Sequence, residues 1–133
     1  MNGFNTILGD AGKETALLQY AQSHQFDRLL LYNLHQILLG DLTNPNTTLT
    51  LALFIEKAKT HYGISQIAAV GENAAFLRNK VQIYNNAHAQ PTQKFDAYNL
   101  EFEFWIDTPI SPGGYYCTTY LIPNGYSWIG SAD

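Results

Sequence analysis

The chain has 133 residues, of which 46% are hydrophobic and only 14% are charged, and this is enough sequence for one domain with one core. The composition excludes a disordered chain, and no apolar run is long enough to cross a bilayer, so we expect no membrane partner. The formal net charge is -4 without any block of Lys or Arg, which argues against a nucleic-acid partner and favours neutral or polar ligands.

Short apolar runs alternate with helical patterns along the first half of the chain. The first run, Phe4–Leu8, predicts a strand, and the spacing of apolar residues from Lys13 to Gln25 predicts a helix. The second run, Arg28–Tyr32, is rich in leucine and is typical of a strand buried on both faces. A helical stretch over residues 34–39 and a longer helix that ends near Gly63, its expected C-cap, follow this second strand.

The third apolar run, Gln66–Val70, predicts another strand. Asn73 can cap the helix after it, which carries its apolar residues on one stripe and ends before Pro91. Strands that alternate with helices of this length predict βα units and a parallel sheet with right-handed crossovers. We therefore expect an α/β fold.

The fourth predicted strand, Asp96–Trp105, alternates large apolar side chains with polar ones. Because successive strand side chains point to opposite faces, Asn99, Glu101 and Glu103 share one face, at a spacing of about 6.5 to 7 Å. An acid that keeps its proton next to a charged carboxylate is what glycosidic bond cleavage requires. The alternative is a half-buried strand whose polar face meets solvent.

A polar residue ends or follows each of the predicted strands. Asp10, Asn33, Glu72 and Glu103 hold these positions. Ligands of parallel α/β sheets bind at the carboxyl ends of the strands, so we expect these side chains to share one substrate-binding site. The alternative is that polar residues are simply common in the loops after strands.

At the fourth strand the chain resembles the chitinase-like glycosidases of glycoside hydrolase family 18 and the related endo-β-N-acetylglucosaminidases. Their fourth barrel strand carries Asp-Gly-x-Asp-x-Asp-x-Glu, and Asp96, Asn99, Glu101 and Glu103 stand at its acidic positions. The residues Ala69-Val70-Gly71-Glu72 stand where the family has Ser-x-Gly-Gly on its third strand. The order of the two motifs along the chain also agrees with the family.

The resemblance covers residues 4–105 and implies a role for each residue of the acidic motif. Glu103 would be the general acid, and Glu101 would orient the acetamido group of the substrate, whose own oxygen is the nucleophile. Asn99 stands where the family has an Asp that holds this helper. Trp105, directly after the motif, is a candidate for stacking on a sugar ring, with a core or interface position as the alternative.

A complete TIM barrel needs about 250 residues, so this chain can hold at most half of one. We therefore expect a half or truncated TIM-barrel-like sheet of four βα-type units over residues 1–105. The expected function is a glycosidase-like domain or fragment, inactive alone, that is related to hydrolases of N-acetylglucosamine-containing glycans. One alternative is a non-catalytic carbohydrate-binding or assembly module on a degenerate half-barrel, and another is a flat flavodoxin-like domain.

Residues 106–133 predict an irregular segment and a terminal β-hairpin within the same single domain, 1–133. The runs Tyr115–Ile122 and Tyr126–Ile129 flank Asn124-Gly125, the strongest short hairpin signal. The hairpin would cover an open sheet edge or pair with another chain, so we expect self-association through the edge or the hairpin. A continuation of the chain that supplies further strands is the alternative.

We expect no metal and no cofactor. The four histidines lack the spacing of metal ligands, and Gly9–Gly12 lacks a complete phosphate-binding motif. Cys117 is the only cysteine, which excludes an intrachain disulfide. The first residues lack a signal-peptide pattern, so we expect a secreted or cell-surface protein if a signal has been removed and a cytoplasmic one otherwise.

Overall fold

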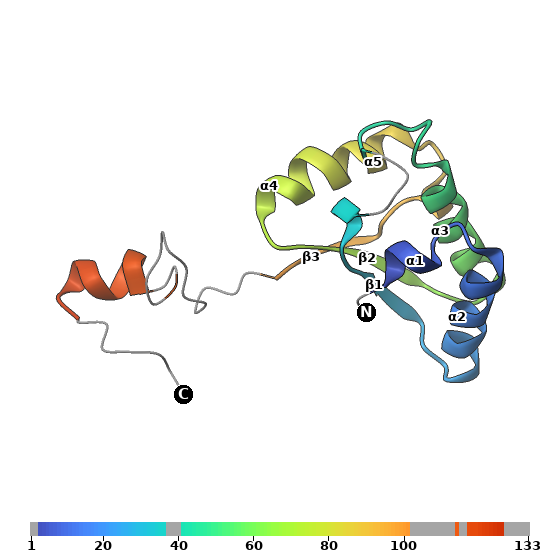
Figure 1. Cartoon of the computed structure of the whole chain (residues 1–133), viewed down its shortest axis with the longest axis horizontal. Coiled ribbons are helices and arrows are strands. Elements are labelled where there is room, and N and C mark those ends of the chain that lie inside the picture. The colour runs from blue at the N-terminus through green and yellow to red at the C-terminus, as the bar shows by residue number, and fades with distance from the viewer. Residues whose placement is uncertain (1–2, 37–40, 102–113, 115–116, 127–133) are drawn as a thin grey trace. The chain divides into compact units, whose positions relative to one another are not determined.

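The computed structural model describes residues 3–36, 41–101, 114 and 117–126 (Figure 1). The chain divides into two compact units, Met1–Glu101 and Phe102–Asp133, and each is described by itself. The expectation that residues 1–133 form a single domain stays a prediction.

The first unit is built on a parallel sheet. Its strands are β1 (Arg28–Leu31), β2 (Gln66–Gly71) and β3 (Ala97–Leu100), in the order β1-β2-β3. Leu30 lies opposite Ala68 of β2, which in turn lies opposite the first residue of β3. The predicted α/β class and parallel βα arrangement are confirmed, and within the described residues the sheet has three strands and does not close into a barrel.

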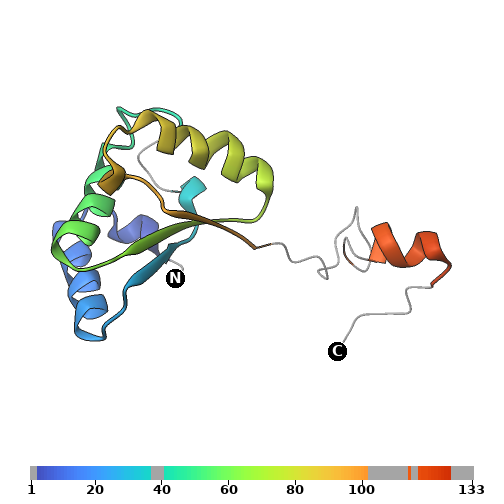
Figure 2. The same ribbon diagram turned by 180° about the vertical axis from the view of Figure 1, so that it is seen from behind.

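Helices precede and connect these strands (Figures 1 and 2). The main ones before β1 and between β1 and β2 are α2 (Ala11–Ser23) and α3 (Leu49–His61). The connection from β2 to β3 is one helical rod made of α4 (Ala74–Phe76), the π-helical segment η2 (Leu77–Val81) and α5 (Gln82–Ala87). The short elements are α1 (Phe4–Ile7), η1 (Leu34–Gln36) and η3 (Pro91–Gln93).

Two helix caps lie where the sequence predicts them. The side-chain oxygen of Asn73 accepts a hydrogen bond from the N–H of Phe76 at 2.8 Å. Gly63 follows α3 with a φ of 73°, and the N–H of Ile64 donates back to the carbonyl of Ala58 at 3.2 Å. Glycine suits this position because a Cβ is strained in the left-handed region.

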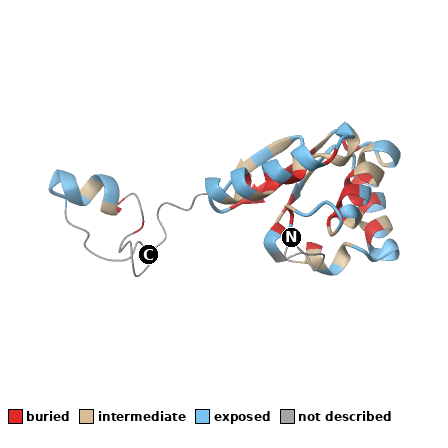
Figure 3. Ribbon diagram, turned by 90° about the horizontal axis from the view of Figure 1, so that it is seen from above, coloured by how far each residue is buried: buried red, intermediate tan, exposed pale blue. Residues whose placement is uncertain are grey.

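The hydrophobic core lies between the sheet and its helices (Figure 3). Leu31, Ile67 and Ala69 reach it from the strands, and Phe54 and Ile55 reach it from α3. Each of these side chains is at most 4% exposed, so they exclude water from the layer between strands and helices.

The strand side chains that alternate with these core residues lie on the other face of the sheet. Leu30, Ala68 and Val70 are outside the core cluster, and Leu30 is 46% exposed. Tyr98 of β3 points toward the helices, because the side-chain amide of Asn85 on α5 donates to its hydroxyl at 3.3 Å. Tyr98 and Leu100, on the predicted apolar face, are nevertheless 45% and 47% exposed.

The prediction of a strand over Phe4–Leu8 is wrong, because this segment contains the helical turn α1. The N–H of Leu8 donates to the carbonyl of Phe4 at 2.9 Å, and the ring of Phe4 packs edge-on against Phe54 with centroids 5.2 Å apart. A short apolar run fits a buried helical turn as well as a strand, and here the contact with α3 decides. The expected four strands are therefore three in the described part of the chain.

The fourth predicted strand, Asp96–Trp105, is confirmed over Ala97–Leu100, which form β3. β3 ends at Leu100, and the N–H of Glu101 still donates to the carbonyl of Gly71 at 3.0 Å, which extends the ladder by one bond. Glu103 and Trp105 lie outside the described residues.

The second unit does not contain the predicted C-terminal hairpin within its described residues. Cys117–Leu121 is a π-helical segment, and Ile122–Asn124 is a 3-10 turn. Gly125, with a φ of 83°, ends this turn, and the N–H of Tyr126 donates to the carbonyl of Leu121 at 3.1 Å. The Asn-Gly pair therefore terminates a helical segment here, which is the other common use of a left-handed glycine.

Within the described residues, no helix is both long and apolar enough to span a membrane.

Candidate functional site

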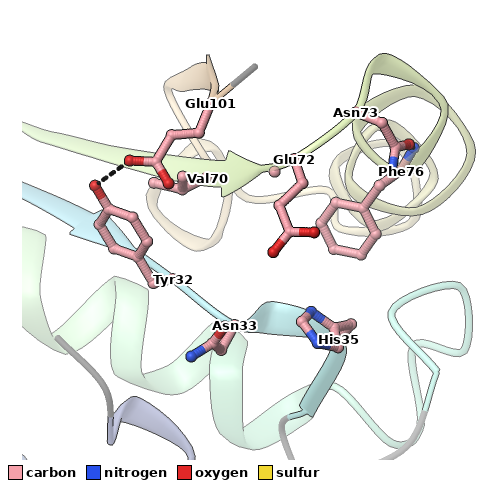
Figure 4. A pocket seen from close by; sticks show the side chains of 9 residues that line it. Tyr32, Asn33, His35, Val70, Glu72, Asn73, Phe76 and Glu101 are labelled. Carbon is pink, nitrogen blue, oxygen red and sulfur yellow. Dashed lines mark hydrogen bonds between the residues drawn. The ribbon is translucent and has the colours of Figure 1, made fainter. Parts of the chain in front are cut away.

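A pocket of about 210 Å³ lies at the carboxyl ends of β1, β2 and β3 (Figure 4). This is the edge of a parallel α/β sheet at which ligands bind. The pocket is lined by Tyr32, Asn33, His35, Val70, Gly71, Glu72, Asn73, Phe76 and Glu101.

The ends of the three strands position the side chains that line the pocket. Tyr32 and Asn33 directly follow β1, and Asn33 has a φ of 55°, a left-handed conformation that Asn tolerates better than most residues. Glu72 follows β2, and Phe76 ends the first turn of the helical rod after it. Glu101 follows β3.

A hydrogen bond joins the two outer strands of the sheet across this pocket. The hydroxyl of Tyr32 donates to Oε1 of Glu101 at 2.8 Å (Figure 4). This bond and the negative charge of Glu101 raise the pKa of Tyr32, because tyrosinate could neither donate the bond nor tolerate the adjacent carboxylate. The side chains therefore close one side of the pocket as a pair.

Phe76 forms an apolar wall of the pocket. The imidazole of His35 meets its ring edge-on, with centroids 6.4 Å apart and an interplanar angle of 88°. Figure 4 shows the side chain of Glu72 beside this ring, with Tyr32 and Glu101 on the other side of the pocket. An aromatic ring and hydrogen-bonding groups thus face a common space.

The pocket carries negative charge and acceptors that have no partner among the described residues. Glu72 forms no hydrogen bond or ion pair with any described residue, and no Lys or Arg is among the described side chains that line the pocket. The described part of the chain also contains no group of three or more His, Cys, Asp or Glu side chains that could hold a metal ion. The site therefore suits a neutral or cationic ligand that donates hydrogen bonds, and it disfavours phosphates and carboxylates.

Three of the sequence-derived candidates lie together in the pocket. Asn33, Glu72 and Glu101 line the pocket. Asn99 lies on β3 opposite Val70 and is not a lining residue. Glu103 and Trp105 fall in the part of the chain that the structure leaves undescribed.

Asp10 lies elsewhere, because the strand that it was expected to follow is the helix α1. It is the N-cap of α2, and its carboxylate accepts hydrogen bonds from the N–H groups of Gly12 at 3.0 Å and Lys13 at 3.1 Å. These bonds and the ammonium of Lys13 hold the pKa of Asp10 below its usual range. Its position is explained by the start of a helix.

Sequence reasoning did not select six of the lining residues, namely Tyr32, His35, Val70, Gly71, Asn73 and Phe76. Tyr32 carried a usable signal, since it is two residues after Leu30 and so continues the face away from the core. The sequence around Asn73 predicts a helix cap and no further role. Nothing in the local sequence around Phe76 separates a pocket wall from a core position.

Comparison of the chain with protein-family models, curated proteins and solved structures yields no match. We therefore infer the function from the geometry and chemistry of the pocket.

Proposed function

We propose that the first unit is a carbohydrate-binding module whose pocket holds one sugar ring without cleaving it. The observation that carries the proposal is the juxtaposition of three groups around one small pocket: the carboxylate of Glu72, which has no partner among the described residues, the amide of Asn33 and the ring of Phe76. Sugars present hydroxyl donors at their rim and C–H groups on their faces, so they need this mixture of acceptors and aromatic surface.

The size of the pocket supports a small ligand. Its volume of about 210 Å³ lies below the range of roughly 300 to 1,000 Å³ that is usual for drug-sized ligands. A single sugar ring with its hydroxyl groups has a size that fits this pocket. The negative charge of Glu72 and Glu101 further favours hydroxyl donors over anionic groups.

Binding is favoured over turnover because few strands supply this site. Barrel glycosidases collect catalytic residues from the ends of several strands, whereas the described sheet has three. We include in the proposal that these strands form an arc of a TIM-barrel-like half-barrel, because consecutive strands are neighbours in such an arc.

A titration of the whole chain tests the binding proposal. In ¹H–¹⁵N spectra, N-acetylglucosamine should shift the amide signals of Glu72, Asn73 and Phe76 in a saturable way, with a Kd on the order of millimolar for a ligand of this size. Glu72→Gln keeps the shape of the side chain and removes its charge, so it should weaken binding about three- to tenfold.

Asp27→Asn is the matched control, because the side chain of Asp27 is 67% exposed and is not a lining residue. This variant should bind the sugar like the unmodified chain. Shifts that do not saturate, or equal affinities for the two variants, would refute the assignment of this pocket.

The second candidate is a family-18-like glycosidase fragment with Glu103 as general acid and Glu101 as its helper. It is supported by the alternation within β3, since Tyr98 faces the helices and Asn99 therefore faces the other side together with Glu101. Incubation with a chitooligosaccharide tests it. Release of shorter products that Glu103→Gln abolishes would favour turnover over binding alone.

A further inference from the structure

We infer that Phe76 is the platform on which one face of a pyranose ring stacks, and that Gly71 is the positioning residue that lets the ring of Phe76 stand there. The inference rests on the proposed function and narrows its ligand class to cyclic sugars. Acyclic polyols, which carry the same hydroxyl groups but have no ring face, are thereby excluded as equivalent ligands.

Gly71 is required by close packing and not by its backbone conformation. Its φ does not lie in the left-handed region, so any residue could adopt its backbone. A Cβ at this position, however, would lie 2.9 Å from Cδ1 of Phe76 and 3.0 Å from Cδ2 of Leu77. The end of β2 therefore carries no side chain at the point where the ring of Phe76 approaches it.

The helical rod holds Phe76 in this position from both ends. The N–H of Phe76 donates to the side-chain oxygen of Asn73 at 2.8 Å. The π-helical segment Leu77–Val81 begins at the next residue. Tyr84 on α5, farther along the same rod, is fully buried. Segments with π-helical geometry frequently occur at functional sites.

The surroundings of the ring match the two surfaces of a pyranose. His35 meets the ring edge-on at 6.4 Å, and Glu72 lies beside it in the pocket (Figure 4). The C–H face of a sugar chair stacks on an aromatic ring, while its equatorial hydroxyl groups point outward toward acceptors. Glu72 and Asn33 are acceptors of this kind around the same space.

The experiment compares two probes, methyl β-D-glucopyranoside and sorbitol, by NMR titration of the whole chain. The unmodified chain should bind the glucoside more tightly than sorbitol. Phe76→Leu keeps an apolar side chain without a stacking surface, so it should weaken glucoside binding about three- to tenfold and leave sorbitol binding unchanged. Phe76→Tyr should restore the preference for the glucoside.

Gly71→Ala should also reduce the ratio of the two affinities, because its Cβ displaces the ring of Phe76. Gly12→Ala is the matched control, since a Cβ there would meet only Oδ1 of Asp10 at an ordinary 3.4 Å. The ratio is the decisive measurement because a loss of folded protein would lower both affinities together.

The outcomes separate the two proposals. If the glucoside and sorbitol bind equally and Phe76→Leu changes neither affinity, the role of Phe76 as a platform is overturned while carbohydrate binding by the pocket stands. If neither probe binds the unmodified chain, both proposals are overturned. If Gly71→Ala leaves the ratio unchanged while Phe76→Leu lowers it, the role of Gly71 is overturned and that of Phe76 stands.

Discussion

At the scale of single residues, Tyr32 and Glu101 show how side chains far apart in sequence define the pocket. Their hydrogen bond of 2.8 Å joins the residues that follow the outer strands β1 and β3. Neither residue has a partner in its local sequence that would reveal this pairing. The bond depends on the parallel register of the sheet, which brings the ends of all three strands to one edge.

The first residue-scale prediction concerns the ionisation of Tyr32. Its pKa is raised above the ordinary value of about 10 by the bond to Glu101, so the bond is present below pH 10 and is lost as the pH rises through the raised pKa. In ¹³Cζ-tyrosine NMR titrations, Glu101→Gln should lower the pKa of Tyr32. A pKa of Tyr32 that does not respond to this substitution would contradict the geometry.

A second residue-scale prediction concerns His88. It is 8% exposed, lies 3.3 Å from the hydroxyl of Thr48 and packs on Tyr84, and burial lowers its pKa. Because the folded chain resists protonation of this imidazole, its contribution to stability is complete above the unfolded pKa of about 6.5 and is lost as the pH falls through the lowered pKa.

His88→Leu should therefore make the free energy of unfolding less dependent on pH between 7 and 5. Thr48 remains paired in this variant, since its hydroxyl also donates to the carbonyl of Asn44 at 3.2 Å. Urea unfolding at the two pH values measures the effect. An unchanged pH dependence would show that other groups control acid stability.

At the scale of elements, Asp96 connects three parts of the first unit. Its Oδ1 accepts from the ammonium of Lys59 on α3 at 2.8 Å, and its Oδ2 accepts from the N–H of Ile67 on β2 at 2.8 Å. Lys59 also donates to the carbonyl of Lys94 at 2.7 Å. The first acidic position of the family-like motif thus holds α3, β2 and the start of β3 together.

Asp96→Ala should lower the free energy of unfolding by about 2 kcal/mol, because it removes charge-assisted hydrogen bonds and leaves a largely buried ammonium without its carboxylate. The side chains of Lys59 and Asp96 are 12% and 34% exposed, so solvent screens this pair only in part. Urea denaturation measures the change.

Asp27→Ala is the control, since its side chain is 67% exposed and its substitution should stay within about 0.5 kcal/mol. Equal stability of the two variants would mean that the connection made by Asp96 contributes little.

At the scale of the molecule, the sheet leaves two edge strands in its described part, β1 and β3. Open edges of parallel sheets have unpaired backbone groups and invite pairing with another chain. Leu30, at 46% exposure on β1, adds apolar surface next to one of these edges. Self-association remains our proposal for how the molecule covers them.

Sedimentation velocity over a range of protein concentrations tests this proposal. The sedimentation coefficient should rise with concentration, and Leu30→Lys should suppress the rise because charged side chains protect sheet edges. Leu49→Lys, on the surface of α3 with 56% exposure, is the matched control and should have no effect. A sedimentation coefficient independent of concentration would count against association.

The sequence by itself determined the elements whose signals are local and mutually consistent. The runs that begin at Arg28 and Gln66 form β1 and β2. As predicted, Asn73 caps the beginning of a helix and Gly63 lies at the end of one. The sequence also placed Asn33 and Glu72 after strands, and both line the pocket because parallel strands present all their carboxyl ends at one edge. Glu101 was predicted inside the fourth strand, whereas it follows β3 in the structure. Strands, helix caps and strand ends can be predicted because each depends on the residues next to it in the sequence.

Only the tertiary structure decided the features that depend on distant contacts. Phe4 is helical because its ring packs on Phe54, and no local pattern distinguishes that turn from a strand. The pocket acquired Phe76 because Gly71 lets the following helix approach the end of β2. The physical reason is the same in both cases: burial and close packing between segments outweigh the weak preferences of a few residues for one backbone conformation.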